Sequence, residues 1–388
     1  MKKIIISLFI VLNLHAQTYE GLLELAIKNN AQLQIAQSQG EEAELQGQIS
    51  TRLENPNVEF ELSDFSSRRL FRENQIGART GISQSLLLPW VKEDKQRLTQ
   101  TQVGEQEQSF RLSKADFIYR FNRQYLVYKE AVKKKELEAE ALEISKKIVA
   151  VAQGRFDGGS IAKSEVLQAK IEQNEVLSQF KAFSLQALQE KNRLLRLANV
   201  ETSFDVDAEH TFVESANSST HPLLELTKKR EQVAKAKLEV ASHSIETIGL
   251  FSEIEAEPDQ DIFRVGVSIP LPVFNNKSQE KQLAKIALNN QKLALETQQR
   301  ALDLELPQLR HEIEVQEALK NSYEALAEEQ KSLLKVYQSG YSIAKINILK
   351  LSTLKNALLM TQKELLSTNL SIERNSIKIN YLQGAYNE

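Results

Sequence analysis

Runs of alternating apolar and polar residues occur at four places in the chain, and they predict β-strands. The strands are predicted at residues 57–65, 77–88, 247–257 and 261–270, each about 10 residues long, the length of a tilted strand that crosses a bilayer. One face of each strand is apolar, and the other carries Glu, Arg, Ser or Gly. The charged residues on the polar faces are Glu59, Glu61, Arg79, Glu253, Glu255 and Arg264.

Between these strands the apolar positions repeat at helical spacing. Helices are predicted at residues 18–53, 92–156, 161–198, 221–243, 275–339 and 342–384. The second would be a rod of about 100 Å, from a rise of 1.5 Å per residue. Pro307 lies in the fifth, so we expect a kink or break there.

Two helices carry narrow apolar seams. The last helix has apolar residues every seven positions, which favours left-handed supercoiling, and the second has four aromatic residues and a valine at spacings of three and four. Such seams suit side-by-side packing in a hollow wall, although a soluble coiled coil would show them too. The two sets are Leu351, Leu358, Leu365, Ile372 and Ile379, and Phe117, Phe121, Tyr125, Tyr128 and Val132.

The two halves of the chain follow the same order of elements. Arg79-Thr80-Gly81-Ile82-Ser83 corresponds to Arg264-Val265-Gly266-Val267-Ser268, and the turn at residues 158–163 corresponds to the turn at residues 340–345. We interpret residues 17–388 as one duplicated, elongated domain, with one repeat at 18–200 and the other at 220–386.

The N-terminal residues resemble a secretory signal peptide. Two lysines precede an apolar run from Ile4 to Leu14, and Ala16 supplies a small residue at its exit. The run is too short to span a bilayer as a helix. A buried N-terminal helix is the alternative, but the segment has no amphipathic face. We therefore expect residues 1–16 to be a signal peptide.

Composition narrows the classes of function. Loss of Lys2 and Lys3 would leave 47 basic and 52 acidic residues, a net charge of −5 that argues against a nucleic-acid partner. The chain has no cysteine, so disulfides are excluded. Beyond the N-terminus no run of about 18 apolar residues occurs, and we expect no transmembrane helix.

The predicted strands cannot form a closed sheet within one chain. Four strands are too few for a barrel, and open sheet edges are not tolerated in hydrocarbon. We therefore expect the chain to oligomerise, and three copies would give twelve strands. Residues 66–75, with Arg68, Arg69 and Arg72, would face outward, and Pro258-Asp259-Gln260 would form a tight turn. Trp90 and Phe274 would lie at the membrane interface, and a core position is the alternative for Trp90.

Several short motifs, in their order along the chain, resemble the TolC family of outer-membrane efflux proteins. They are Asn55-Pro56-Asn57, His221-Pro222-Leu223-Leu224, the segment 268–274, and Val166-Leu167-Gln168-Ala169 and Ile348-Leu349 after the two turns. The resemblance covers nearly all of the mature sequence. It implies a mostly α-helical fold with a membrane β-barrel, in which a homotrimer builds twelve strands and a tunnel of long antiparallel coiled-coil helices. It also implies an equatorial segment at residues 199–220.

The resemblance further implies partners. Family members receive substrate from an inner-membrane pump through a periplasmic adaptor, which meets the channel at its helix turns. Those turns are also explained as ordinary helix caps with left-handed glycine, and both roles are compatible. By position, the adaptor-docking residues are Arg155, Phe156, Asp157, Gly158, Gly159 and Ser160, with Tyr337, Gln338, Ser339, Gly340, Tyr341 and Ser342.

Acidic residues near the second turn narrow the entrance in family members. The matching positions here are Asn347 and Lys350, with Glu165 in the first repeat, so an acidic ring is not expected. On the barrel strands, the charged residues would either set the electric field of the lumen or form cross-strand ion pairs, and we expect both.

No catalytic or cofactor site is predicted. His210, His221, His243 and His311 are scattered without ligand spacing, and Met360 is the only methionine outside the signal segment. The Glu-Lys run at residues 133–140 is interpreted as a solvated helix face.

The predicted function is a passive outer-membrane exit duct, with outer-membrane lipid around its barrel, for small molecules or metal ions. Type I protein secretion and a soluble periplasmic scaffold or adaptor are the alternatives.

Overall fold

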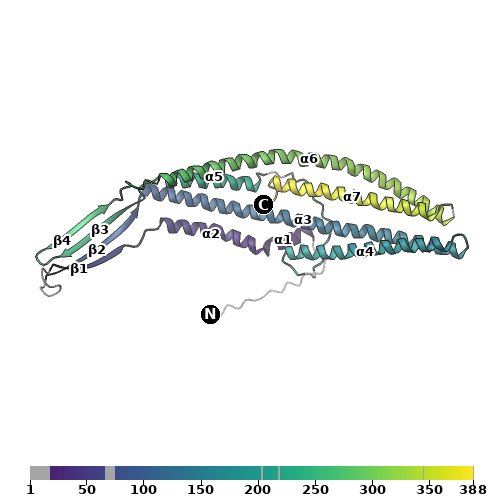
Figure 1. Ribbon diagram of the computed structural model, residues 1–388, viewed down its shortest axis with the longest axis horizontal. Helices are drawn as coiled ribbons and strands as arrows, with labels where there is room; N and C mark the ends of the chain where they lie inside the picture. Colours follow the sequence, from purple (N-terminus) through teal and green to yellow (C-terminus); the bar gives the residue numbers. More distant parts are fainter. Residues whose placement is uncertain (1–17, 66–74, 202–203, 217–218, 344, 388) are drawn as a thin grey trace, which may run out of the picture. The chain divides into compact units, whose positions relative to one another are not determined.

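The computed structural model describes residues 18–65, 75–201, 204–216, 219–343 and 345–387. Most of this chain is helical, and one four-stranded antiparallel sheet accompanies the helices (Figure 1). The helices are α1 (Tyr19–Lys28), α2 (Ala31–Thr51), α3 (Pro89–Asp157), α4 (Lys163–Leu197), α5 (Pro222–Ala241), α6 (Ser278–Ser342) and α7 (Ile348–Leu382). The strands are β1 (Asn57–Asp64), β2 (Ile76–Leu87), β3 (Thr247–Ala256) and β4 (Asp261–Ser268).

The sheet has the order β1-β2-β3-β4, so each strand pairs with its neighbour in sequence. The register aligns Glu61 with Arg79 and Glu255, and it aligns Glu253 with Arg264. Residues 257–260 join β3 to β4 in a tight turn, where Glu257 N donates to Gln260 O at 2.8 Å. Among the described residues, β1 and β4 each have a strand neighbour on one side only.

The described chain divides into two compact units, and each draws on both halves of the sequence. One unit contains residues up to Leu33, Ser113–His221 and Ala301–Glu388, and therefore both helix turns and α7. The other contains Gln34–Leu112 and Pro222–Arg300, and therefore the whole sheet and α5.

The predicted helix at residues 18–53 is wrong in one respect, because it is interrupted at two asparagines. Asn29 caps the end of α1, and Asn30 Oδ1 accepts from the backbone N–H groups of Gln32 and Leu33 at 2.9 and 3.2 Å. An asparagine side chain that satisfies free N–H groups favours a new helix start over continuation. Two adjacent helices result where the apolar pattern alone indicated one.

Pro307 does not break α6, which is continuous from Ser278 to Ser342. Proline removes one backbone hydrogen bond, but tertiary packing holds the helix on both sides of it. Leu309, Ile379 and Leu382 form a buried cluster between α6 and α7, with Leu302 and Leu306 packed against it.

Two of the expectations lie outside the described residues. They are the signal peptide at residues 1–16 and most of the loop at residues 66–75 with its three arginines. Among the helices that are described, none is long and apolar enough to cross a membrane.

Candidate functional site

The sheet has one apolar face, and that face is exposed. The register places Phe60, Thr80, Ile254 and Phe263 side by side across the four strands, with Val58, Ile82 and Val265 in the next row. Phe60 is 79% exposed and Phe263 is 67% exposed. A contiguous exposed apolar surface of this kind indicates a contact site for another protein or for lipid.

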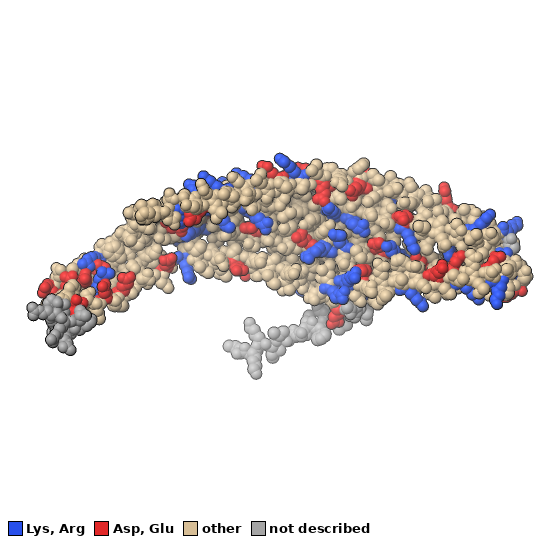
Figure 2. All heavy atoms as spheres, viewed as in Figure 1, with Lys and Arg blue, Asp and Glu red and all other residues tan. Residues whose placement is uncertain are grey.

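The opposite face carries a chain of ion pairs across the strands. Arg79 Nε lies 3.6 Å from both Glu61 and Glu253, and Arg264 Nη1 lies 2.6 Å from both Glu253 and Glu255. Acidic and basic side chains are intermingled over the sheet in Figure 2. The cross-strand pairs expected from the sequence are therefore present, while Glu59 has no ion-pair partner among the described residues.

Phe251 is one of two aromatic side chains that lie over a glycine on this polar face, the other being Phe65 over Gly77. Phe251 is opposite Gly266 in the register, and a Cβ atom on Gly266 would lie 2.5 Å from the Phe251 ring. Only glycine leaves room for the ring at that position.

The turn after α3 is a glycine-terminated helix cap. Gly159 has a φ of +72°, its N–H donates to Phe156 O at 2.9 Å, and the Ser160 N–H donates to Arg155 O at 2.8 Å. These two bonds and the left-handed glycine define a Schellman motif. The expectation of a left-handed glycine is confirmed at this turn.

The second turn is built differently, and the sequence placed it too early. Residues 337–342, expected at the turn, all lie within α6, which ends at Ser342, and α7 begins at Ile348. Gly340 has no positive φ; its carbonyl accepts from Lys345 N and Ile346 N at 2.8 and 3.2 Å. The Ile346 side chain folds over Gly340, where an added Cβ would lie 2.6 Å from it. Gly340 therefore provides space for a side chain, because the chain folds back onto the helix.

Both turns pack on one apolar cluster within their unit. Its buried members include Ala152 of α3, Val166 of α4, Tyr341 of α6 and Ile348 of α7. Arg155 links the ends of α3 and α6 directly, because its Nη1 donates to Tyr341 O at 3.1 Å and its guanidinium lies 4.7 Å from the centre of the Tyr341 ring. Burial raises the pKa of Tyr341, and the nearby Arg155 opposes that rise.

The three residues expected at the entrance start helices. Asn347 is the N-cap of α7, and its Oδ1 accepts from Lys350 N at 3.0 Å. Glu165 lies in the first turn of α4, where its charge complements the helix dipole, whereas α7 has no acidic residue in its first turn.

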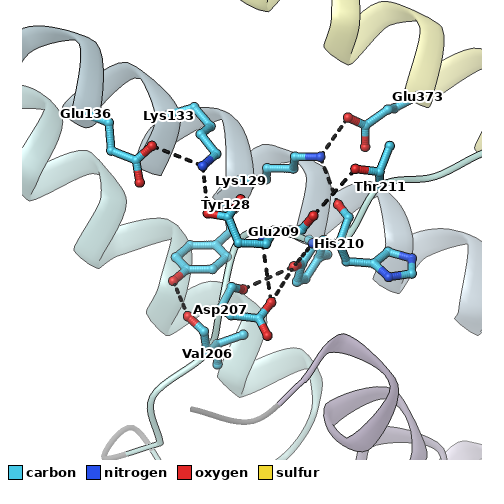
Figure 3. Close-up of polar contacts among 11 residues, drawn as sticks. Tyr128, Lys129, Lys133, Glu136, Val206, Asp207, Glu209, His210, Thr211 and Glu373 are labelled. Atoms are coloured by element: carbon cyan, nitrogen blue, oxygen red, sulfur yellow. Dashed lines mark hydrogen bonds and ion pairs between the residues drawn. The ribbon is translucent and has the colours of Figure 1, made fainter.

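The segment at residues 204–216 is held to α3 and α7 by polar contacts (Figure 3). Lys129 Nζ donates to Glu373 at 2.7 Å and to His210 O at 2.8 Å, and Glu373 also accepts from Phe212 N at 3.2 Å. Tyr128 donates to Val206 O at 2.7 Å, and burial raises the pKa of its phenol to about 12.

His210 anchors the same segment through its ring. The imidazole stacks on Tyr19 of α1 with centroids 3.8 Å apart, and its Nδ1 lies 3.2 Å from Glu20. Burial lowers the pKa of His210, against the opposing effect of Glu20.

Buried charges also join α7 to the helices beside it. Glu138 of α3 is 1% exposed and pairs with Lys363 at 2.5 Å. Lys355 is 2% exposed and lies 3.5 Å from Glu172 of α4 and 3.3 Å from Ser145 Oγ. The interpretation of residues 133–140 as a solvated face is therefore wrong at Glu138.

Sequence reasoning missed these buried contacts because their partners are far apart in the chain. Lys129 and Glu373 are separated by 244 positions. The spacing of the aromatic residues around Tyr125 correctly predicted a buried face on α3. It did not predict which segment packs against that face. Among the described residues, no group of three or more His, Cys, Asp or Glu side chains is arranged to hold a metal ion.

No family model matches the sequence, and no curated protein matches it. Solved structures, in contrast, match along nearly the whole chain. CusC, described with transmembrane channel formation, is 15% identical with a TM-score of 0.79, and the match covers 94% of this chain and 91% of CusC. The outer membrane protein VceC of Vibrio cholerae is 14% identical with a TM-score of 0.79, covering 94% and 95%.

The MtrE outer membrane channel of Neisseria gonorrhoeae, in its open state, is 15% identical with a TM-score of 0.76 over 94% of this chain and 88% of MtrE. CusC and MtrE are described as channels, and VceC as an outer membrane protein. The expected mostly helical fold with four short strands is thus confirmed, and it is the fold of solved outer membrane channels such as MtrE.

Proposed function

We propose that the chain is the outer-membrane exit duct of a tripartite efflux system. Three copies would form a passive channel with a twelve-stranded barrel in the outer membrane and a periplasmic tunnel of coiled-coil helices. The exposed apolar face of the sheet carries this proposal, because Phe60 and Phe263 lie in water in a lone chain. In the trimer that face would contact lipid.

The open edges of the sheet support association between copies. Unpaired N–H and C=O groups on β1 and β4 are costly in hydrocarbon, and pairing β1 of one copy with β4 of the next would satisfy them. The ion pairs around Arg79 and Arg264 would then line a wet lumen, and Glu59 would add to its negative field.

Exposed apolar side chains on two helices support contact between copies. Leu319, Leu326 and Leu333 of α6 recur every seven residues and are each more than 40% exposed. On α4, Leu167 and Ile171 are likewise exposed. Seams of this spacing pack against other long helices.

The two helix turns are the proposed docking ends for a periplasmic adaptor, which would connect the duct to an inner-membrane pump. The Arg155–Tyr341 contact joins the turns within a chain. Residues Glu165, Asn347 and Lys350 would lie at the entrance, where opening requires neighbouring helix pairs to separate.

The experiment is conductance in planar lipid bilayers with the purified mature chain. We expect discrete channel openings and a trimer on gel filtration in detergent. The chain has no cysteine, so Ser160→Cys introduces one thiol at the first turn. A reducible cross-linker between copies at that position should lower conductance, and reduction should restore it.

Lys181→Cys is the control, because this exposed α4 position is remote from the turn. Its cross-linking should leave conductance unchanged. A water-soluble monomer without conductance would contradict the exit-duct function and support a soluble scaffold instead.

A further inference from the structure

The end of α6 and the start of α7 carry lysines and no carboxylate. Residues 330–363 contain six lysines and neither Asp nor Glu, in a chain whose net charge is −3. Lys355 and Lys363 are paired with Glu172 and Glu138. The other four are exposed and have no ion-pair partner among the described residues: Lys331, Lys335, Lys345 and Lys350.

This lack of partners sets the four lysines apart from many others in the same unit. Lys129, Lys133, Lys146, Lys191 and Lys378 each form an ion pair with Glu or Asp. In Figure 2, basic side chains are visible over the end at which α6 and α7 meet. The dipole of α7 adds positive potential at its N-terminus, and no acidic residue in the first turn compensates it.

Exposed apolar side chains lie among these lysines. Val336, Ile343 and Leu349 are 63%, 62% and 60% exposed. An apolar patch with a charged rim of one sign is typical of a protein interface, where the apolar part contributes affinity and the rim contributes steering. A small anion would need the lysines but not the apolar residues, so the combination favours a protein partner.

The first turn lacks this character although its sequence is similar. Asp157 and Glu165 accompany Arg155 and Lys163 there, so the charges are balanced. The two turns therefore differ in their own charge, and at the end of α6 Arg155 and Glu165 of the first turn oppose each other in their effect on the pKa of Tyr341.

We infer that the α6–α7 turn recognises a helical partner whose contacting end has carboxylates around an apolar tip. The inference rests on the proposed function, in which such a partner would be the adaptor. The four lysines would attract the carboxylates of the partner, and Val336, Ile343 and Leu349 would contact its apolar tip.

The test uses the full mature chain in detergent and two synthetic helical hairpins as probes. Both hairpins have a leucine tip; one has four glutamates around it and the other has four lysines. We expect the chain to bind the acidic hairpin more tightly, with affinity that falls as salt rises. The variant K331E/K335E/K345E/K350E should bind it about tenfold more weakly or worse and should prefer the basic hairpin, since four exposed charge pairs are reversed.

The matched control K147E/K181E/K285E/K292E changes four other exposed lysines and should bind as the unmodified chain does. Equal affinity of the unmodified chain for both hairpins, or equal loss in both variants, would overturn the inference. An altered ion selectivity in K331E/K335E/K345E/K350E with unchanged hairpin binding would also overturn it and assign the lysines to solutes.

Conductance measured on the same preparation separates the two proposals. A conducting channel without hairpin preference contradicts only the docking inference, whereas hairpin preference without conductance contradicts only the duct.

Discussion

At the scale of single residues, Lys129 shows how the helical unit is held together. Its ammonium group is almost fully buried and contacts both the Glu373 carboxylate and the His210 carbonyl. A buried charge is tolerated only when its partner and hydrogen bonds are in place. The pair therefore fixes α3, α7 and the segment between α4 and α5 in one arrangement.

Lys129→Met should strongly destabilise the protein, because Glu373 would remain as an uncompensated buried charge. The expected loss is about 3–5 kcal/mol. Adding Glu373→Gln should recover most of it, since a neutral amide still accepts from Phe212 N. Thermal unfolding followed by circular dichroism measures both variants, and equal midpoints for the single and double variants would contradict the argument.

His210 predicts a local dependence on pH. Burial lowers its pKa below the unfolded value, so the unfolded segment binds protons more readily than the folded one. Stability is therefore present above the unfolded pKa and falls as the pH drops below about 6.5. Glu20, Glu373 and Asp207 favour the charged ring, while Lys129 opposes it.

Amide hydrogen exchange of residues 206–214 should accelerate between pH 7 and pH 5 relative to the intrinsic rate, which itself falls with pH, so the protection factors of these residues should decrease. His210→Gln removes the titrating ring and should abolish that extra acceleration. Persistence of the effect in this variant would assign it to another group.

Sequence alone revealed only those residue contacts that follow from strand alternation. Arg79 and Arg264 were expected on one face with four glutamates, and their ion pairs are present. The ion pair between Lys129 and Glu373 was not predicted, because the sequence around a charged helical residue does not indicate which distant helix packs against it.

At the scale of elements, the two helix turns end their helices by different devices. The first depends on left-handed Gly159, and the second depends on Ile346 folded over Gly340 and on the Asn347 cap. The shared sequence suggested one design for both. The difference arises because the tertiary position of the following isoleucine, not the glycine alone, decides where the second helix ends.

Gly159→Ala should destabilise the first turn by about 1–2 kcal/mol, because a residue with Cβ is strained at positive φ. Gly154→Ala is the matched control: Gly154 is helical, with nothing within 4 Å of an added Cβ, and should gain up to about 1 kcal/mol. Urea unfolding of the two variants measures both effects, and equal shifts would contradict the assigned backbone conformation.

Long helices and alternating strands were predicted to within a few residues, because their periodicity extends over many positions. The interruption at Asn29 and Asn30 was missed, since helix capping depends on single side chains that leave the apolar pattern unchanged. The continuity of α6 through Pro307 reflects packing that the sequence pattern does not record.

At the scale of the whole molecule, the sheet of one chain is incomplete. Its apolar face is exposed and two of its edges lack strand neighbours among the described residues. The sheet needs further strands from other copies to close. The alternating sequence of one chain already contains the apolar face and the short strand count that imply this need, so the sequence could indicate oligomerisation. The expectation of three copies rests on the four strands of each chain, which would give twelve in a trimer, and on the family resemblance.

Phe60→Arg should impair insertion into lipid vesicles, because a cation on the lipid-facing side of a barrel costs about 2–4 kcal/mol near the bilayer centre. Glu59→Arg places the same side chain on the neighbouring polar-face position and should insert normally. Folding yield in vesicles, followed by circular dichroism, compares the two. Equal yields would contradict the proposed orientation of the sheet.

The Phe251–Gly266 contact has a consequence for how this sequence can change over generations. A mutation that adds a side chain at position 266 collides with the ring unless position 251 has already become smaller. The two codons should therefore vary together among descendants of this gene, with the loss of the aromatic ring preceding any gain at the glycine.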